Sequence, residues 1–318
     1  MSPAWRVAIL TDDPGWHGRR LARALGALGV AATFASLSDC AVDLEANRWG
    51  IVVPGFDARL PDGVFVREIA AGSFEQVTLR LGLLHALAEW GVPVCNSARA
   101  IERTVDKSMT SMLLRKAGIA TPATWVTERE GRARATLKRE TEAGHKLVLK
   151  PLFGSQGKGL RLLGAGDDLP AAGDYADVYY LQRFVEPGGR DGCDYRVFVI
   201  AGEAVAAMVR RGSGWVHNVA QGARCEPATL DLEMARLAER AVEAIGMDYA
   251  GVDIMRDRAG APVVIEINGI PAWHGLQSVT PFDIARGLAQ HLIGRMLGGE
   301  HTGSPPRPRE IIPVERGS

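Results

Sequence analysis

Hydrophobic residues recur along the chain with two spacings, one typical of strands and the other of helices. Strand-like runs at 5–10 (WRVAIL) and 30–36 (VAATFAS) flank an amphipathic stretch from His17 to Leu28. This order predicts a β-α-β unit and therefore a parallel sheet. Residues Asp12 to Gly15 follow the first strand, at the end of such a sheet where ligands often bind, but we interpret them as a chain-reversing turn.

The first lobe of the predicted fold ends near Asn96. Leucines at helical spacing predict a helix from Glu75 to Trp90, which is followed by Gly91 and the strand-like VPVCN. Asn96 and Ser97 can cap a long helix that continues to Lys116.

The remaining pattern predicts two further lobes that are rich in antiparallel strands. The predicted elements are a strand at 123–127, a helix at 132–143, strands at 146–153, 160–163 and 178–185, a hairpin at 194–211, a helix at 230–245, a hairpin at 251–268 and a helix at 282–297. The fold class is thus α/β and α+β, with a parallel-sheet domain at 1–97, a central lobe at 98–177 and a C-terminal lobe at 178–298. Residues 299–318 lack periodicity and are interpreted as a disordered tail.

Composition indicates an ordinary globular protein. The 318 residues are 47% hydrophobic and 23% charged, and 37 Lys and Arg balance 37 Asp and Glu. Zero formal charge gives no global attraction to nucleic acid or to an anionic membrane. The four cysteines are far apart, which favours reduced thiols over a zinc site or disulfides. Without a signal-peptide pattern or a long apolar segment, the expected location is the cytoplasm.

A glycine-rich loop is the first candidate for phosphate binding. In KPLFGSQGKG the strand residue Lys150 is followed by the loop Gly154–Gly159, whose backbone N–H groups can converge on an anion. The pattern matches neither a Walker loop nor a Rossmann fingerprint, because a strand rather than a helix follows it. A flexible hairpin is the alternative interpretation.

The last predicted hairpin carries a candidate metal site. Glu266 and Asn268 lie two apart on one strand, so both project from one face while Ile265 faces the other. A turn centred on residues 258–261 sets Asp253 opposite Glu266. Opposed carboxylates destabilise a sheet unless a cation lies between them, and Mg²⁺ prefers such oxygen ligands. The alternative is an exposed polar face.

Basic residues complete the candidate chemistry. Arg196 and the pair Arg210 and Arg211 fall near opposite positions of the first hairpin, where they can reach a phosphoryl group. Surface positions are the alternative for these arginines, as they are for Lys107 in TVDKSM.

The order of these motifs resembles the ATP-grasp superfamily, specifically its RimK-like glutamate ligase branch, including tetrahydromethanopterin glutamate ligases. A lysine, a second lysine with a glycine-rich loop, VYYLQRFV, D-x-R, GVDI and IEINGIPAWHGL follow one another over roughly 92–292. The resemblance implies an ATP-grasp fold, in which the two antiparallel-rich lobes enclose ATP.

The resemblance also implies roles for individual residues. The implied phosphate and nucleotide contacts are Lys107, Lys150, Gly154, Ser155, Gln156, Gly157, Lys158, Gly159, Asp194, Asn218 and backbone groups of Arg183 and Phe184. Arg196 and Arg210 are the implied catalytic residues, and Asp253, Glu266 and Asn268 the implied magnesium ligands. The chain departs from the best-known members at Val216 and His217, where these have Arg and Ser, and His217 has either a proton-carrying or a positional role.

The implied reaction joins a carboxylate to an amine through an acyl-phosphate, with ATP and Mg²⁺ as one or two ions and Mn²⁺ as a substitute. Arg67 can clamp a substrate carboxylate, and Trp273 and His274 follow the metal ligands where the family binds its acceptor; a surface arginine and a packing tryptophan are the alternatives. The substrates implied are L-glutamate or another amino acid and a small carboxylate such as a pterin cofactor precursor, or a glutamyl or protein tail. No nucleic-acid or membrane partner is expected, and a homo-oligomer is compatible with the sequence. A non-catalytic ATP-binding regulatory module and an ATP-grasp phosphotransferase are the competing functions.

Overall fold

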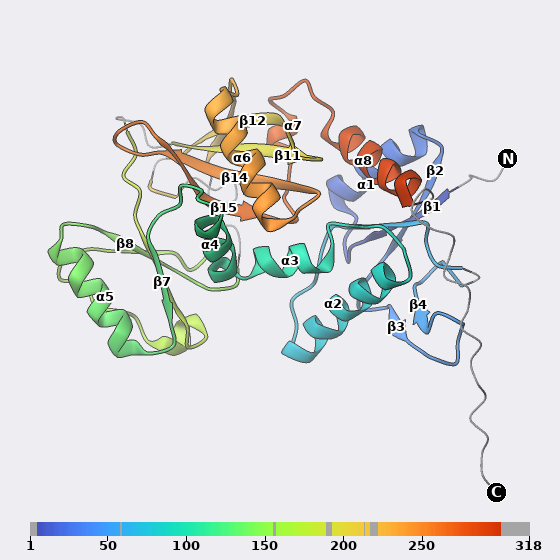
Figure 1. The fold of residues 1–318 in the computed structure, drawn as a ribbon, viewed down its shortest axis with the longest axis horizontal. Coiled ribbons are helices and arrows are strands. Elements are labelled where there is room, and N and C mark those ends of the chain that lie inside the picture. The colour runs from blue at the N-terminus through green and yellow to red at the C-terminus, as the bar shows by residue number, and fades with distance from the viewer. Residues whose placement is uncertain are drawn as a thin grey trace, which may run out of the picture.

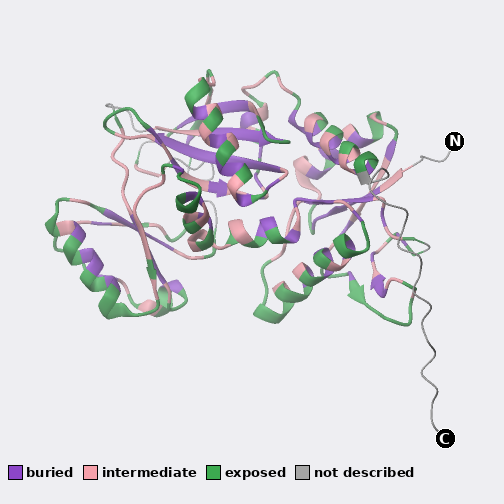
Figure 2. Cartoon of the chain, in the orientation of Figure 1, coloured by how far each residue is buried: buried purple, intermediate pink, exposed green. Residues whose placement is uncertain are grey.

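The structure, a computed structural model, describes residues 5–57, 59–154, 157–188, 193–212, 214–216 and 222–299. Figure 1 shows an elongated molecule in which the N-terminal and C-terminal lobes adjoin and the smaller central lobe projects to one side. Figure 2 shows that the buried residues concentrate on the strands, whereas the outer faces of the helices are exposed. Of the tail predicted at 299–318, Gly299 belongs to the last helix of the chain, and residues 300–318 lie outside the described residues.

The N-terminal lobe contains the predicted parallel sheet. Its strand order is β2-β1-β5-β6, and every pair is parallel. Its elements are β1 (Trp5–Leu10), α1 (Gly15–Ala27), β2 (Val30–Ala35), β3 (Ala41–Val42), β4 (Ile51–Val52), β5 (Gly63–Val66), α2 (Phe74–Glu89) and β6 (Val94–Cys95). At the start of α2 the Ser73 side chain accepts the Gln76 N–H, and Gln76 accepts the Ser73 N–H in return, which fixes this end of the helix.

The last helix of the chain packs on this first lobe. Helix α8 (Ile284–Gly299) lies beside α1, as Figure 1 shows, although the two are more than 250 positions apart. Leu288, Leu292 and Met296 of α8 share one hydrophobic core with Leu21 and Leu25 of α1. The N-terminal core is therefore completed by the C-terminal end of the chain, which the sequence pattern did not predict.

The central lobe is a twisted antiparallel sheet covered on one face by a helix. Its strand order is β7-β10-β8-β9. Its elements are β7 (Thr124–Thr127), α5 (Glu130–Glu142), β8 (Leu147–Lys150), β9 (Arg161–Leu163), the short 3-10 helix η1 (Ala172–Tyr175) and β10 (Tyr179–Arg183). Strand β10, which the boundary at residue 177 assigned to the C-terminal lobe, lies in the middle of this sheet. That boundary was wrong because β10 pairs with β7 and β8, whose paired residues precede it by 30 to 58 positions.

The C-terminal lobe contains the two predicted hairpins in one antiparallel sheet, of order β13-β12-β11-β14-β15. Its elements are β11 (Cys193–Ile200), β12 (Glu203–Arg211), β13 (Arg224–Pro227), α6 (Leu232–Ile245), β14 (Tyr249–Arg256), β15 (Pro262–Asn268) and the short helix α7 (His274–Gln277). Helix α6 covers one face through Met234, Ala238 and Ile245. The opposite face carries the polar side chains described below.

The predicted long helix at 97–116 is two helices. Ser97 accepts the Ala100 N–H and caps α3 (Ala98–Val105), as expected. Asp106 then adopts an extended backbone, and its carboxylate accepts the N–H groups of Ser108 and Met109. Aspartate caps a helix start well, so α4 (Lys107–Lys116) begins here with Lys107 as its first residue. Helix α4 packs on α6 and β15 of the C-terminal lobe and also reaches the central sheet through the hydrogen bond between Ser111 and Tyr180, whereas α3 packs on both α2 and α6.

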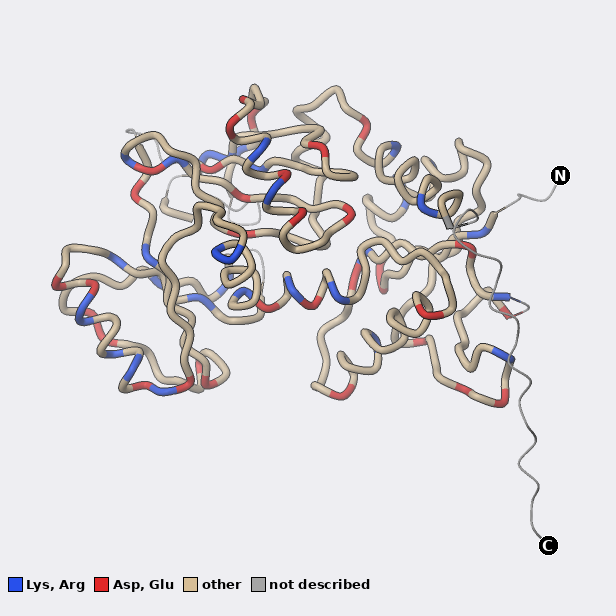
Figure 3. Tube along the Cα trace, in the orientation of Figure 1, with Lys and Arg blue, Asp and Glu red and all other residues tan. Residues whose placement is uncertain are grey.

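Charges are mixed over the whole molecule. Figure 3 shows Lys and Arg interspersed with Asp and Glu on all three lobes. Among the described residues, no helix is both long enough and apolar enough to cross a membrane.

Candidate active site between the central and C-terminal lobes

The three predicted metal ligands converge on one face of the C-terminal sheet. Asp253 on β14 pairs directly with Glu266 on β15, as predicted, and the Asn268 Nδ2 group lies 3.3 Å from the Asp253 Oδ2 atom. The pairing arises differently from the prediction, because the ladder shifts by one residue at a bulge after Asp253. In consequence Ile265, predicted to face away, lines the same pocket as Glu266.

Asp253 is the centre of a buried ion network. Arg196 Nε and Nη2 each donate to the Asp253 carboxylate over 2.7 Å, and Arg210 Nη2 lies 3.0 Å from Asp253 Oδ2. Arg210 also donates through Nε and Nη2 to Asp194, over 2.6 Å each. The two arginines hold the pKa of Asp253 down to about 2 against the opposing effect of burial. Arg196 and Arg210 are therefore buried residues of the site, whereas Arg211 has the alternative surface position and pairs with Glu226.

The donor set fits a magnesium ion. Asp253 Oδ1 accepts one described hydrogen bond, from Arg196, and so retains a lone pair for a metal. Asn268 donates through its amide nitrogen, which leaves its carbonyl oxygen as a ligand. Glu266, part-exposed at the pocket wall, makes no ion pair within the described part of the chain. Carboxylate and amide oxygens are the hard ligands that Mg²⁺ requires.

Two lysines face these carboxylates from other elements. Lys150 at the end of β8 is buried, and its Nζ donates to Gln182 Oε1 over 2.6 Å. Burial lowers the pKa of Lys150, while Glu266 acts in the opposite direction, and the same two causes act on the pKa of Lys107. The negative charge of Glu266 therefore favours the protonated form of both lysines. Gln182, which sequence reasoning missed, is tied in turn to Thr124 and Tyr180, so it fixes the Lys150 ammonium group in place.

The glycine-rich loop lies over Lys107. Lys107 Nζ donates to the carbonyl groups of Leu152 and Gly154, over 3.3 and 2.7 Å. Gly154, Gly157 and Gly159 all have positive φ, and a Cβ at Gly159 would approach Pro151 Cγ to 2.8 Å, so this turn requires glycine. Lys158 lines the same pocket. Ser155, Gln156, His217 and Asn218 lie outside the described residues.

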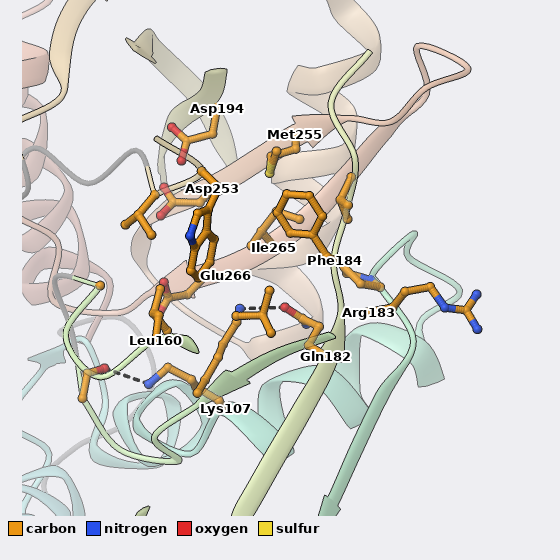
Figure 4. Close-up of a pocket in the computed structure, with 18 of the residues that line it drawn as sticks. Lys107, Leu160, Gln182, Arg183, Phe184, Asp194, Asp253, Met255, Ile265 and Glu266 are labelled. Atoms are coloured by element: carbon orange, nitrogen blue, oxygen red, sulfur yellow. Dashed lines mark hydrogen bonds between the residues drawn. The ribbon is translucent and has the colours of Figure 1, made fainter. Parts of the chain in front are cut away.

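The other end of the pocket is apolar and suits a nucleobase. Leu160, Phe184, Met255 and Ile265 line it, as Figure 4 shows, and Trp215 lies edge-on to Phe184 with ring centroids 6.1 Å apart. Except for Phe184, whose backbone was expected to contact the nucleotide, these residues were not predicted, because apolar pocket walls and apolar cores have the same sequence pattern.

The backbone of Arg183 and Phe184 lies beside this apolar end, and its hydrogen bonds limit which of its groups can contact adenine. The N–H groups of Arg183 and Phe184 are already bonded to the carbonyls of Ala123 and Lys146, so contact with adenine would have to use their carbonyl groups. The Arg183 side chain points away from the pocket and pairs with Glu140.

A second polar cluster lies where the N-terminal lobe meets the loop after Asn268. Arg67, at the end of β5, donates to the Pro271 carbonyl over 3.2 Å and stacks on Trp273 with its Cζ atom 4.4 Å from the ring centroid. Trp273 is completely buried, as the packing interpretation expected, while His274 is exposed. His17, also missed, accepts the N–H groups of Trp273 and His274 at its Nε2 atom. Residues 12–15 form the expected turn, in which Asp13 accepts the Gly15 N–H.

The arrangement of two lobes around a lysine-lined, carboxylate-lined pocket agrees with the family comparison. Residues 5–101 match the RimK PreATP-grasp domain and residues 104–292 match the RimK-like ATP-grasp domain. The chain belongs to the RimK-like ATP-grasp family. Family members bind ATP with Mg²⁺, and the chain is accordingly an ATP-dependent ligase.

Named relatives of this RimK-like protein are ligases. It is 35% identical to the tetrahydromethanopterin:alpha-L-glutamate ligase of Methanocaldococcus jannaschii over 73% of this chain and 79% of the relative. It is 29% identical to the alpha-aminoadipate–LysW ligase LysX of Saccharolobus solfataricus over 63% and 74% of the two chains.

Solved structures show the same fold. The ATP-grasp ligase PsnB, complexed with a minimal precursor, Mg and ADP, matches with a TM-score of 0.70 and 23% identity over 92% of this chain and 97% of its own. A RimK domain ATP-grasp protein from Sphaerobacter thermophilus matches with a TM-score of 0.68 and 22% identity over 91% and 100%.

Proposed function

We propose that this RimK-like ligase activates a carboxylate with ATP and joins it to the amine of an amino acid, L-glutamate in the first instance. The observation that carries the proposal is the convergence of Asp253, Glu266 and Asn268 on one side of the pocket with Lys107 and Lys150 on the other. The named glutamate ligase among the relatives supports the choice of amino acid. A carboxylate-bearing small molecule, such as a pterin-type cofactor precursor, or a glutamyl or protein tail is the proposed acceptor.

The site residues divide the work by charge. Mg²⁺, as one or two ions with Mn²⁺ as a substitute, would be held by Asp253, Glu266 and Asn268 and would neutralise phosphate oxygens. Lys107 and Lys150 supply positive charge to the phosphates from the opposite wall. Lys107 uses two of its three N–H donors on the loop carbonyls, which leaves the third for a phosphate oxygen.

The two arginines are oriented for the transferred phosphoryl group. Arg196 and Arg210 use their Nε and Nη2 atoms to hold Asp253 and Asp194, which leaves the Nη1 group of each for a phosphoryl oxygen. Both guanidinium groups are held in place by aspartates and are almost completely buried from solvent. They therefore need no reorganisation to stabilise charge on an acyl-phosphate. The amine then attacks the acyl carbon, and ADP and phosphate leave.

An assay of ADP release separates this function from its competitors. Purified protein would be incubated with ATP, Mg²⁺, carboxylate acceptors and a panel of amino acids, and the products weighed by mass spectrometry. The ligase proposal requires ADP and a product heavier by one amino-acid residue, or several, only when an amine is present. ADP release without an amine would indicate a phosphotransferase, and ATP binding without turnover a regulatory module.

A further inference from the structure

The cluster around Arg67 lies at a position where parallel sheets bind ligands. The chain runs from β1 to β2 on one side and then returns to β5 on the other, so the strand order reverses between β1 and β5. Ligands of open α/β sheets bind in the crevice at the carboxyl ends of such strands. Arg67 directly follows β5, and His17 lies in the first turn of α1, which follows β1.

Arg67 presents an edge that two other arginines of the chain use to hold carboxylates. Arg196 and Arg210 each grip an aspartate through Nε and Nη2. In Arg67 the Nη1 atom is bound to the Pro271 carbonyl, whereas the buried Nε atom has no hydrogen-bond partner in the described chain. Arg67 also interacts with the Tyr249 hydroxyl group, so Nε is the donor that it retains for a carboxylate from outside the chain.

The surroundings of Arg67 leave its charge uncompensated. No carboxylate of the described residues lies within ion-pair distance of it, although Glu68 is its neighbour in sequence and accepts instead from Thr11 and Asp12. The indole N–H of Trp273, stacked under the guanidinium, is also buried without a partner. Two adjacent unsatisfied donors in a native structure call for an acceptor from outside the chain.

The Arg67 cluster lies next to the arginines of the active site, with Pro271 between them. A Cβ atom at Gly251 would lie 3.2 Å from Pro271 Cβ and 3.5 Å from Arg196 Cδ. Pro271 therefore separates Arg67, which binds its carbonyl group, from Arg196, which binds Asp253. A substrate held at Arg67 would lie beside the site where the amide bond forms.

We propose that Arg67 binds a non-reacting carboxylate of the amino acid that supplies the amine, and that His17 is the positioning residue for this subsite. The inference rests on the proposed ligase function and adds to it the residues that recognise the amino-acid substrate. His17 acts through the loop Pro271–His274, in which it accepts the N–H groups of Trp273 and His274. That loop contacts Arg67 through the Pro271 carbonyl group and the Trp273 ring, so His17 sets the position of the groups that orient the guanidinium.

The test of Arg67 compares substrates that differ in one charge. Wild-type enzyme would be assayed with L-glutamate, L-glutamine and the α-amide of glutamate, and kcat/KM measured for each. We expect kcat/KM for one of the two amides to be roughly 10- to 100-fold lower than for glutamate, because that amide loses a charge-assisted hydrogen bond to Arg67. In Arg67→Gln that preference should disappear, while KM for ATP stays within about twofold.

A matched arginine provides the control. Arg6 stacks on Phe56 in the same lobe, 4.6 Å from its ring centroid, but at the opposite end of β1. Arg6→Gln should retain the wild-type preference. If Arg67→Gln also retains it, the carboxylate assignment is overturned. If wild-type enzyme shows no amine-dependent ADP release, the ligase function itself fails.

The role of His17 is tested by two substitutions of different chemistry. His17→Gln keeps an acceptor near the Nε2 position and should retain kcat/KM for glutamate within about threefold. His17→Phe keeps a ring but no acceptor, and we expect KM for glutamate to rise at least 10-fold while KM for ATP is unchanged. Equal effects on both KM values, or a Gln variant as impaired as the Phe variant, would refute the positioning role.

Discussion

Replacing Asp253 and Glu266 one at a time should show which carboxylate stabilises the fold and which acts only in catalysis. Asp253→Asn and Glu266→Gln each remove one negative charge at neighbouring positions of the same hairpin. Both should reduce amine-dependent turnover at least about 100-fold, because each removes a proposed metal ligand. Only Asp253→Asn should destabilise the fold, because Asp253 is 4% exposed and bound by two arginines, whereas Glu266 makes no described ion pair.

The magnitude follows from the ion network. Arg196 and Arg210 hold the pKa of Asp253 below its ordinary value, so the surroundings of this carboxylate stabilise its ionised form. Removing one member of a buried ion pair costs about 3 to 5 kcal/mol, and asparagine retains part of the hydrogen bonding. We therefore expect Asp253→Asn to lower the free energy of unfolding by about 2 to 4 kcal/mol.

The measurement is urea unfolding followed by tryptophan fluorescence and circular dichroism, with metal chelated so that ligand loss does not contribute. Glu266→Gln should change the free energy of unfolding by less than about 0.5 kcal/mol. Equal destabilisation by both substitutions would contradict the asymmetric network, and an Asp253→Asn variant of normal stability would show that the arginines do not depend on this carboxylate.

Three further predictions concern lysine placement, pH and the nucleobase wall. Lys150→Met should weaken ATP binding at least about 10-fold in calorimetric titration, and Gln182→Leu, which frees the lysine, should weaken it less; the reverse order would exclude the proposed division of roles. The pKa of His17 is lowered to about 4 by burial, Arg67 and His274, so its contribution to stability is complete above pH 6.5 and is lost as pH falls toward 4. Because His17 is partly exposed, the loss should be on the order of 1 kcal/mol, and His17→Gln should not show it in melting curves at pH 7 and 5. Phe184→Ala should raise KM for ATP several-fold without changing the amino-acid preference, and an unchanged KM would remove Phe184 from the nucleotide wall.

Local patterns in the sequence were sufficient to predict the parallel sheet, both hairpins and the proximity of Asp253, Glu266 and Asn268, because each depends on short-range periodicity or on a short turn. The pairing of Asp253 with Glu266 was correct, but a bulge and not an unbroken ladder produces it. The bulge turns Ile265 into the pocket, and no periodic pattern predicts such a one-residue shift.

Features formed by distant segments were not predictable in this way. Strand β10 joins the central sheet through partners far away in sequence, and His17 meets Trp273 across more than 250 positions. In the sequence Gln182 is a single polar residue within an apolar strand, and only the structure shows that it accepts a hydrogen bond from Lys150. Burial and partnership of such side chains depend on tertiary packing, which short-range periodicity does not record.

The packing of α8 on the first lobe has a consequence for synthesis. A nascent chain that has emerged only through β6 has all strands of its parallel sheet, but Leu292 and Met296, which cover part of that core, have not yet been translated. The N-terminal lobe therefore completes its core only after the whole ligase has been made. A gene truncated before residue 284 should yield an aggregation-prone product in which even the lobe farthest from the deletion is incomplete.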